Sequence, residues 1–156
     1  MDQPRALSDA EAAAAWSAVA AAWDVSDASW WFPLAETRRR GIVAFQAEAF
    51  HAALGPAWLR RVLAAHGVER TIHFPEFREL PAEEASLADA AFRFDGVERY
   101  WCDARAEHRD WLVYASHEDS LTLGGSWLVA AAQRAWPGWA AHLWAGLPDC
   151  HRPEFD

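Results

Sequence analysis

The hydrophobic period of the chain changes at Gly67, and this change limits the folds that the sequence can adopt. Before Gly67, apolar residues recur three and four positions apart, as on the inner face of a helix. After Gly67, the run ERTIHF alternates apolar and polar side chains, which is typical of a half-buried strand. Helices followed by strands predict an α+β fold, in which helices pack on a sheet.

Three helices are predicted in the first part of the chain. Ser8 is the expected N-cap of a helix over 8–23, because Asp9 and Glu11 follow it. Residues 36–66 predict two helices that are split by the Gly55-Pro56 break. The inner face of the first of these two helices is predicted to hold Ile42, Phe45 and Ala49.

The second part of the chain predicts an antiparallel meander and a closing helix. Residues 75–89 carry five acidic side chains and two prolines and are expected to be a loop, with or without a short helix. The expected strands that follow are 91–94 running on to 97–103, then 109–115 and 119–123. Ser126 is expected to cap a last helix. We therefore expect one domain over 1–156, with N-terminal helices on one face of a small antiparallel sheet and a C-terminal helix that closes it.

The acidic charge balance limits the partners of the chain. Its net charge is −9, which excludes a surface built to neutralise nucleic-acid phosphates and suits a basic partner. An alternative is that the acidity only keeps the protein dispersed. The alanine-rich run 12–22 is too short to span a bilayer, and the first ten residues lack the features of a signal peptide. We expect a cytoplasmic protein without membrane contact. Cys102 and Cys150 are far apart in sequence and are expected to be free thiols.

The sequence offers no established catalytic motif. Ser116, His117, Glu118 and Asp119 are adjacent, but neighbouring strand residues point to opposite faces, so this serine and histidine do not form a catalytic pair. The GxSxG and HExxH patterns are both missing. We therefore predict no catalytic residue, no metal site and no cofactor, and interpret SHED as a polar hairpin tip.

The chain contains eleven tryptophans, more than a small core requires. In the segment Trp30-Trp31-Phe32, burial of all three rings is awkward, which favours a contact with a partner. The alternative for the other tryptophans is that they fill a core otherwise built from small alanines.

The segment from Trp111 to Gly125, which includes Tyr114, Ser116-His117-Glu118 and Gly124-Gly125, resembles part of some small bacterial proteins of the polymorphic-toxin immunity type. The resemblance implies a cytosolic α+β protein that inhibits one cognate toxin by occluding it. It transfers no catalytic residues.

The predicted function is therefore a non-enzymatic protein-binding module that inhibits a toxin. Its predicted contact residues are Trp30, Trp31, Glu76, Glu79, Glu83, Glu84, His117, Glu118 and Asp119. The main alternative is a small enzyme or small-molecule-binding protein with a pocket between helices and sheet, where Tyr100, Asp103, His117 and Glu118 converge. A third is a homo-oligomer whose extra tryptophans pack against a second copy.

Overall fold

The computed structural model describes residues 3–24, 40–76 and 79–146. In chain order these residues form β1 (Arg5–Ala6), α1 (Asp9–Trp23), β2 (Ile42–Gln46), α3 (Ala47–Ala53), α4 (Gly55–Ala65), β3 (Arg70–Pro75), β4 (Glu83–Ser86), β5 (Arg99–Asp103), β6 (Leu112–Ala115), β7 (Ser120–Gly124), α5 (Ser126–Ala135) and the 3-10 helix η1 (Trp139–His142).

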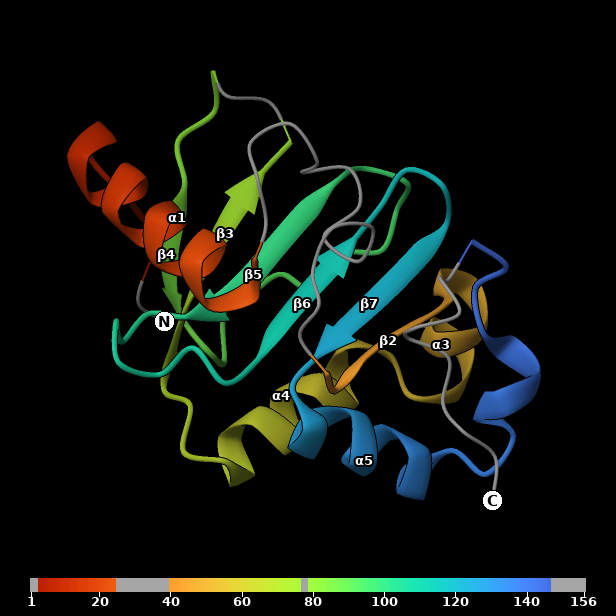
Figure 1. Cartoon of the computed structure of the whole chain (residues 1–156). Coiled ribbons are helices and arrows are strands. Elements are labelled where there is room, and N and C mark those ends of the chain that lie inside the picture. The colour runs from red at the N-terminus through yellow and green to blue at the C-terminus, as the bar shows by residue number, and fades with distance from the viewer. Residues whose placement is uncertain (1–2, 25–39, 77–78, 147–156) are drawn as a thin grey trace.

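The strands of the described residues form one antiparallel sheet in the order β1-β4-β3-β5-β6-β7-β2 (Figure 1). The α+β class and the antiparallel sheet are confirmed, and β5, β6 and β7 form the predicted meander. The sheet is open, with β1 at one edge and β2 at the other.

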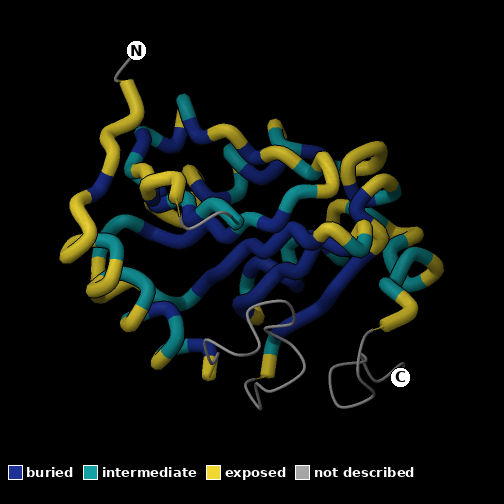
Figure 2. Tube along the Cα trace, turned by 90° about the horizontal axis from the view of Figure 1, so that it is seen from above, coloured by how far each residue is buried: buried dark blue, intermediate teal, exposed yellow. Residues whose placement is uncertain are grey.

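Helices cover both faces of this sheet, not one face as predicted. Helix α1 lies on one face, while α3, α4 and α5 lie on the other (Figure 1). Two hydrophobic cores result, and consecutive residues of β6 divide between them: Tyr114 enters the core under α1 and Val113 enters the core under the other three helices. Figure 2 shows the sheet strands as a buried layer between exposed peripheral segments. Because both faces of the strands are apolar, a single helical layer would leave one face uncovered.

The largest correction concerns residues 42–46, which were predicted to be helical and form strand β2. Ile42 and Phe45 have helical spacing, but the unbroken apolar run from Ile42 to Phe45 is also typical of a strand buried on both faces. All five residues of β2 pair with β7, and the helix begins only at Ala47.

Two further segments differ from the prediction. The expected loop over 75–89 contains β4, which pairs with β1 on one side and β3 on the other. Residues 91–94 are not a strand, although Phe92 is buried there against Trp101. In both cases tertiary contacts override the local pattern. The glutamates of β4 disfavour a strand, yet one forms; the alternating phenylalanines of 91–94 favour a strand, yet none forms.

The predicted start of α1 and the predicted break before α4 are confirmed. Ser8 caps α1 in a capping box with Glu11, and α4 begins at Gly55 with Pro56 in its first turn. Helix α5 is preceded by Gly125 as its N-cap residue, and Ser126 is its first residue rather than its cap. None of the helices in the described ranges has the length and apolar character needed to cross a bilayer.

Candidate functional site

The hairpin between β6 and β7 carries the polar tip that the sequence predicted. β6 ends at Ala115 and β7 begins at Ser120, so the SHED residues form the turn. Ser116 serves this turn rather than a catalytic pair: its hydroxyl accepts hydrogen bonds from the N–H groups of Glu118 and Ser120. Asp119 has a φ of 60°, a left-handed conformation that suits a turn residue.

A buried glutamate, Glu98, lies beside this tip. The residue precedes β5 and its side chain is 0% exposed. Its Oε1 accepts a hydrogen bond of 2.5 Å from the Tyr114 hydroxyl and lies 3.6 Å from Nδ1 of His117. His117 Nε2 in turn lies 2.9 Å from Oε1 of Glu118. We call Glu98, His117 and Glu118 the carboxylate–histidine cluster.

The local environment alters the acidity of the groups around this cluster. Burial raises the pKa of Glu98, although the hydrogen bond from Tyr114 and the nearby His117 act in the opposite direction. Burial, Tyr100 and Glu98 together raise the pKa of Tyr114 far above its usual range. Tyr114 is therefore a neutral hydrogen-bond donor that orients the Glu98 carboxylate.

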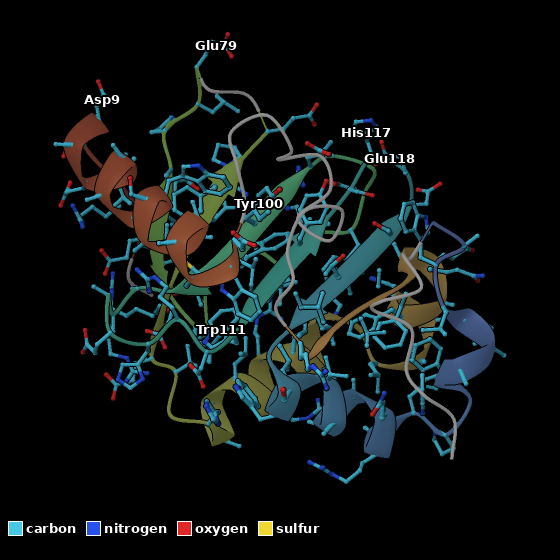
Figure 3. All side chains as sticks on the ribbon, in the orientation of Figure 1. Asp9, Glu79, Tyr100, Trp111, His117 and Glu118 are labelled. Atoms are coloured by element: carbon cyan, nitrogen blue, oxygen red, sulfur yellow. The ribbon has the colours of Figure 1, made fainter. Side chains whose placement is uncertain are left out.

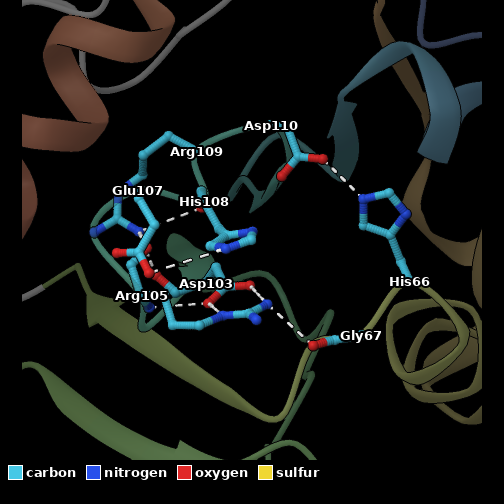
Figure 4. Close-up of polar contacts among 8 residues, drawn as sticks. All are labelled: His66, Gly67, Asp103, Arg105, Glu107, His108, Arg109 and Asp110. Atoms are coloured by element: carbon cyan, nitrogen blue, oxygen red, sulfur yellow. Dashed lines mark hydrogen bonds and ion pairs between the residues drawn. The ribbon is translucent and has the colours of Figure 1, made fainter.

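Of the four residues proposed to converge on an enzyme site, His117 and Glu118 contact each other, and Tyr100 is linked to them through Tyr114 and Glu98. Tyr100 joins the neighbourhood of His117 and Glu118 because its ring stacks on Tyr114, with ring centroids 4.5 Å apart. Asp103, at the other end of β5, instead forms an ion pair of 2.8 Å with Arg105 (Figure 4). Burial acts to raise the pKa of Asp103, but hydrogen bonds from Arg105 outweigh burial and lower it. Asp103 is thus part of a structural ion pair.

Glu98 was missed by the sequence analysis, although a signal for it was available. Glu98, Tyr100 and Cys102 are two residues apart, so the alternation of the predicted strand places all three on one face. Tyr100 also lies opposite Tyr114 in the β5–β6 ladder. A glutamate on a face that is otherwise aromatic and apolar indicates a buried carboxylate.

The predicted acidic contact residues also gather at one end of the sheet. Figure 3 places Glu79 at the same end of the molecule as His117 and Glu118. Glu76 follows β3, and its carboxylate accepts a hydrogen bond from the backbone N–H of Glu98. This bond links the residue after β3 to the segment beside the hairpin tip. We call Glu76, Glu79, Glu83, Glu118 and Asp119 the acidic end.

The other predicted contact residues lie elsewhere. Glu84 forms ion pairs with Arg5, at 2.7 Å, and Arg70, at 2.6 Å, and its side chain is only 19% exposed. Trp30 and Trp31 lie outside the described residues. The described tryptophans are all buried or partly buried, so none of them forms an exposed anchor. Among the described residues the large exposed hydrophobic side chain is Leu80, next to Glu79.

A hollow of about 190 Å³ opens on the sheet face opposite α1, beside β3, β4 and β5. His73, Arg93, Arg99 and Trp101 line it, but His117 and Tyr100 do not. Small-molecule sites commonly have volumes of roughly 300–1,000 Å³, so this hollow is small for a ligand pocket.

Comparisons with protein-family models, with curated proteins and with solved structures gave no match to this chain.

Proposed function

We propose that this chain is a non-enzymatic protein-binding module of the immunity type, which occludes a basic toxin domain with its acidic end. The observation that carries the proposal is the placement of Glu76 and Glu79 at the same end of the molecule as Glu118, although they lie far apart from it in sequence. Glu76 and the hairpin tip both adjoin Glu98. Carboxylates held at strand ends present a fixed negative surface, which accelerates encounter with a basic partner.

Leu80 gives this surface an apolar contact. Its side chain is 55% exposed and follows Glu79 directly. Interfaces commonly combine a buried apolar centre with a charged rim. Leu80 is proposed as an apolar contact in addition to Trp30 and Trp31, whose predicted role lies outside the described residues.

The first test is the gene neighbourhood, where we expect a gene for a basic toxin domain beside the gene for this chain; the product of that gene is then the binding partner to be measured. We expect a one-to-one complex whose association rate falls as salt concentration rises. The variant Glu79→Arg/Glu83→Arg should slow association about tenfold or more and flatten its salt dependence. Glu84 is left unchanged because its ion pairs with Arg5 and Arg70 support the fold.

The matched control is Glu69→Arg/Glu107→Arg. Both glutamates are exposed and lie outside the acidic end, and the two double variants make the same change in net charge. We expect the control to bind and protect cells from the toxin as the wild type does. Equal binding by both double variants would contradict the role of the acidic end, and the absence of any complex would contradict the proposed function.

A small enzyme is the second candidate, and Glu98 favours it. A buried carboxylate with a raised pKa beside an imidazole is an arrangement that acid–base catalysts use. The variant Glu98→Gln separates the two candidates, because it removes a buried carboxylate and leaves the surface charges in place. Unchanged toxin binding and protection by this variant supports the inhibitor.

A further inference from the structure

The carboxylate–histidine cluster has the composition and spacing of a metal site. Glu98, His117 and Glu118 each offer a ligand atom, and these three atoms lie within 4.8 Å of one another. A tetrahedral ion with bonds of about 2.1 Å holds its ligands about 3.4 Å apart. The side chains of His117 and Glu118 are 37% and 33% exposed and lie in a hairpin turn, so rotation about their side-chain bonds can close the remaining distance.

Both carboxylates of the cluster leave one oxygen without a hydrogen bond. Oε2 of Glu98 and Oε2 of Glu118 are buried, and neither has a hydrogen-bond partner within the described part of the chain. Leaving a buried polar atom unpaired costs roughly 1–3 kcal/mol, and more for a charged group. Glu98 is entirely buried, so solvent does not relieve this cost. A cation bound between the two carboxylates would satisfy both of these oxygens at once.

A protonated His117 does not satisfy the cluster by itself. Its two ring nitrogens face Oε1 of Glu98 and Oε1 of Glu118, so Oε2 of both carboxylates stays unpaired. A cation placed among the three residues attracts both carboxylates and takes one imidazole nitrogen as a ligand. The Tyr114 hydroxyl and the contact with Glu76 hold Glu98 in place for this role.

We propose that Glu98, His117 and Glu118 bind a divalent first-row transition-metal ion such as Zn²⁺. One imidazole nitrogen with two carboxylates suits Zn²⁺ or Mn²⁺ better than Mg²⁺ or Ca²⁺, which favour sites made of oxygen alone. Three protein ligands leave one position of a tetrahedral ion open for water or for a group from a partner. The metal site does not depend on the proposed inhibitor function, because all three ligands belong to this chain and no partner protein supplies one.

The test measures zinc binding by the full chain after dialysis against a chelator. Calorimetric titration with ZnCl₂ should give one ion per chain at low micromolar or lower dissociation constant, together with a higher thermal midpoint. Glu98→Gln and His117→Ala should each weaken zinc binding at least tenfold. His117 lies in the exposed turn, so His117→Ala keeps the test valid even if Glu98→Gln fails to fold.

The matched control is Glu107→Gln/His108→Ala, which alters an adjacent glutamate and histidine whose side chains are 72% and 45% exposed. It should bind zinc as the wild type does. Absence of zinc binding, zinc binding that neither cluster variant weakens, or displacement of zinc by an equal concentration of Mg²⁺ would each overturn the proposal. Displacement by Mg²⁺ would identify the cluster as a nonspecific acidic patch.

Discussion

His73 is a residue whose surroundings disfavour its charged form. Its side chain is 25% exposed and its ring stacks on Trp101, at a centroid distance of 5.5 Å. Burial, and then Arg99 and Arg93, lower its pKa to about 4, while Glu83 lies 4.0 Å from its Nδ1. The folded protein therefore keeps His73 neutral where the unfolded chain protonates it.

This predicts a loss of stability in mild acid. The contribution of neutral His73 is fully present above pH 6.5, its ordinary pKa, and is lost as pH falls from 6.5 towards 4. The loss is at most about 3.5 kcal/mol, since the pKa falls from 6.5 to about 4 and one pKa unit corresponds to about 1.4 kcal/mol. Urea unfolding across this range should show that His73→Gln loses less stability than the wild type.

The control for the His73 experiment is His108→Gln, which removes an imidazole whose side chain is 45% exposed. It should follow the wild-type pH profile more closely than His73→Gln does. If the wild type and His73→Gln lose stability in parallel, burial of His73 does not govern this pH dependence.

At the same scale, the sequence predicted part of the candidate site. His117 and Glu118 were singled out because they are adjacent polar residues at a turn. Asp103 was wrongly grouped with them. It lies at the end of β5 opposite to Glu98, and the length of the strand separates it from the hairpin tip. Glu98 was missed although its alternation with Tyr100 and Cys102 signalled an apolar face, because the predicted fold left one face of the sheet without a helix to bury it.

The start of α1 depends on its capping box. The hydroxyl of Ser8 accepts a hydrogen bond of 3.3 Å from the N–H of Glu11, and Oε2 of Glu11 accepts one of 2.8 Å from the N–H of Ser8. We expect Ser8→Ala to lower the free energy of unfolding by about 1 kcal/mol. The N–H of Glu11 loses its hydrogen-bond acceptor, and the reciprocal bond from the N–H of Ser8 to Glu11 loses the hydroxyl that helps to hold the Glu11 side chain in place. Chemical denaturation measures this change.

Ser17→Ala is the control within the same helix. Ser17 is exposed in the interior of α1, where alanine is the better helix former. This variant should keep or slightly raise stability. Equal losses from the two substitutions would show that the capping box contributes nothing specific.

The contact between α1 and β7 requires a glycine. A methyl group on Gly124 would lie 2.8 Å from Cζ3 and 2.9 Å from Cη2 of Trp23, whose ring is 1% exposed and has little room to move. Gly124→Ala should therefore lower the free energy of unfolding by about 1–3 kcal/mol. In Gly138→Ala the nearest atom would be 3.6 Å away, so a thermal unfolding series should show a much smaller effect. Similar losses would mean that the Trp23 ring shifts freely.

Among the elements, caps and breaks were the most predictable features, because they depend on residues within one turn. The Ser8 cap and the Gly55-Pro56 break follow from local chemistry alone. Strands β2 and β4 were missed because their formation depends on partners distant in sequence. The run from Ile42 fits a helix or a strand equally well until β7 is known to pair with it.

At the scale of the whole molecule, the fold separates acidic side chains with different roles. Glu84 points to Arg5 and Arg70 and joins β4 to its neighbours through ion pairs. Glu83, next to it, has a side chain that is 48% exposed, and its ion pair within the described ranges is a long contact of 4.0 Å with His73. Adjacent strand residues point to opposite faces, so one glutamate serves the fold and the next belongs to the acidic end.

These two neighbours allow the acidic end to be tested without a partner. Glu84→Gln should lower the free energy of unfolding by about 1–2 kcal/mol, because it weakens charged hydrogen bonds to two arginines at a mostly buried position. Glu83→Gln should change it by less than about 0.5 kcal/mol, since an exposed surface change away from a specific contact has little effect. Urea denaturation of both variants at low salt gives the comparison.

If Glu83→Gln is as destabilising as Glu84→Gln, the acidic end supports the fold and its charges are not reserved for a partner. If Glu83→Gln leaves the free energy of unfolding unchanged or slightly raises it, the result supports the interpretation that the acidic end holds like charges together for binding, at a cost in stability.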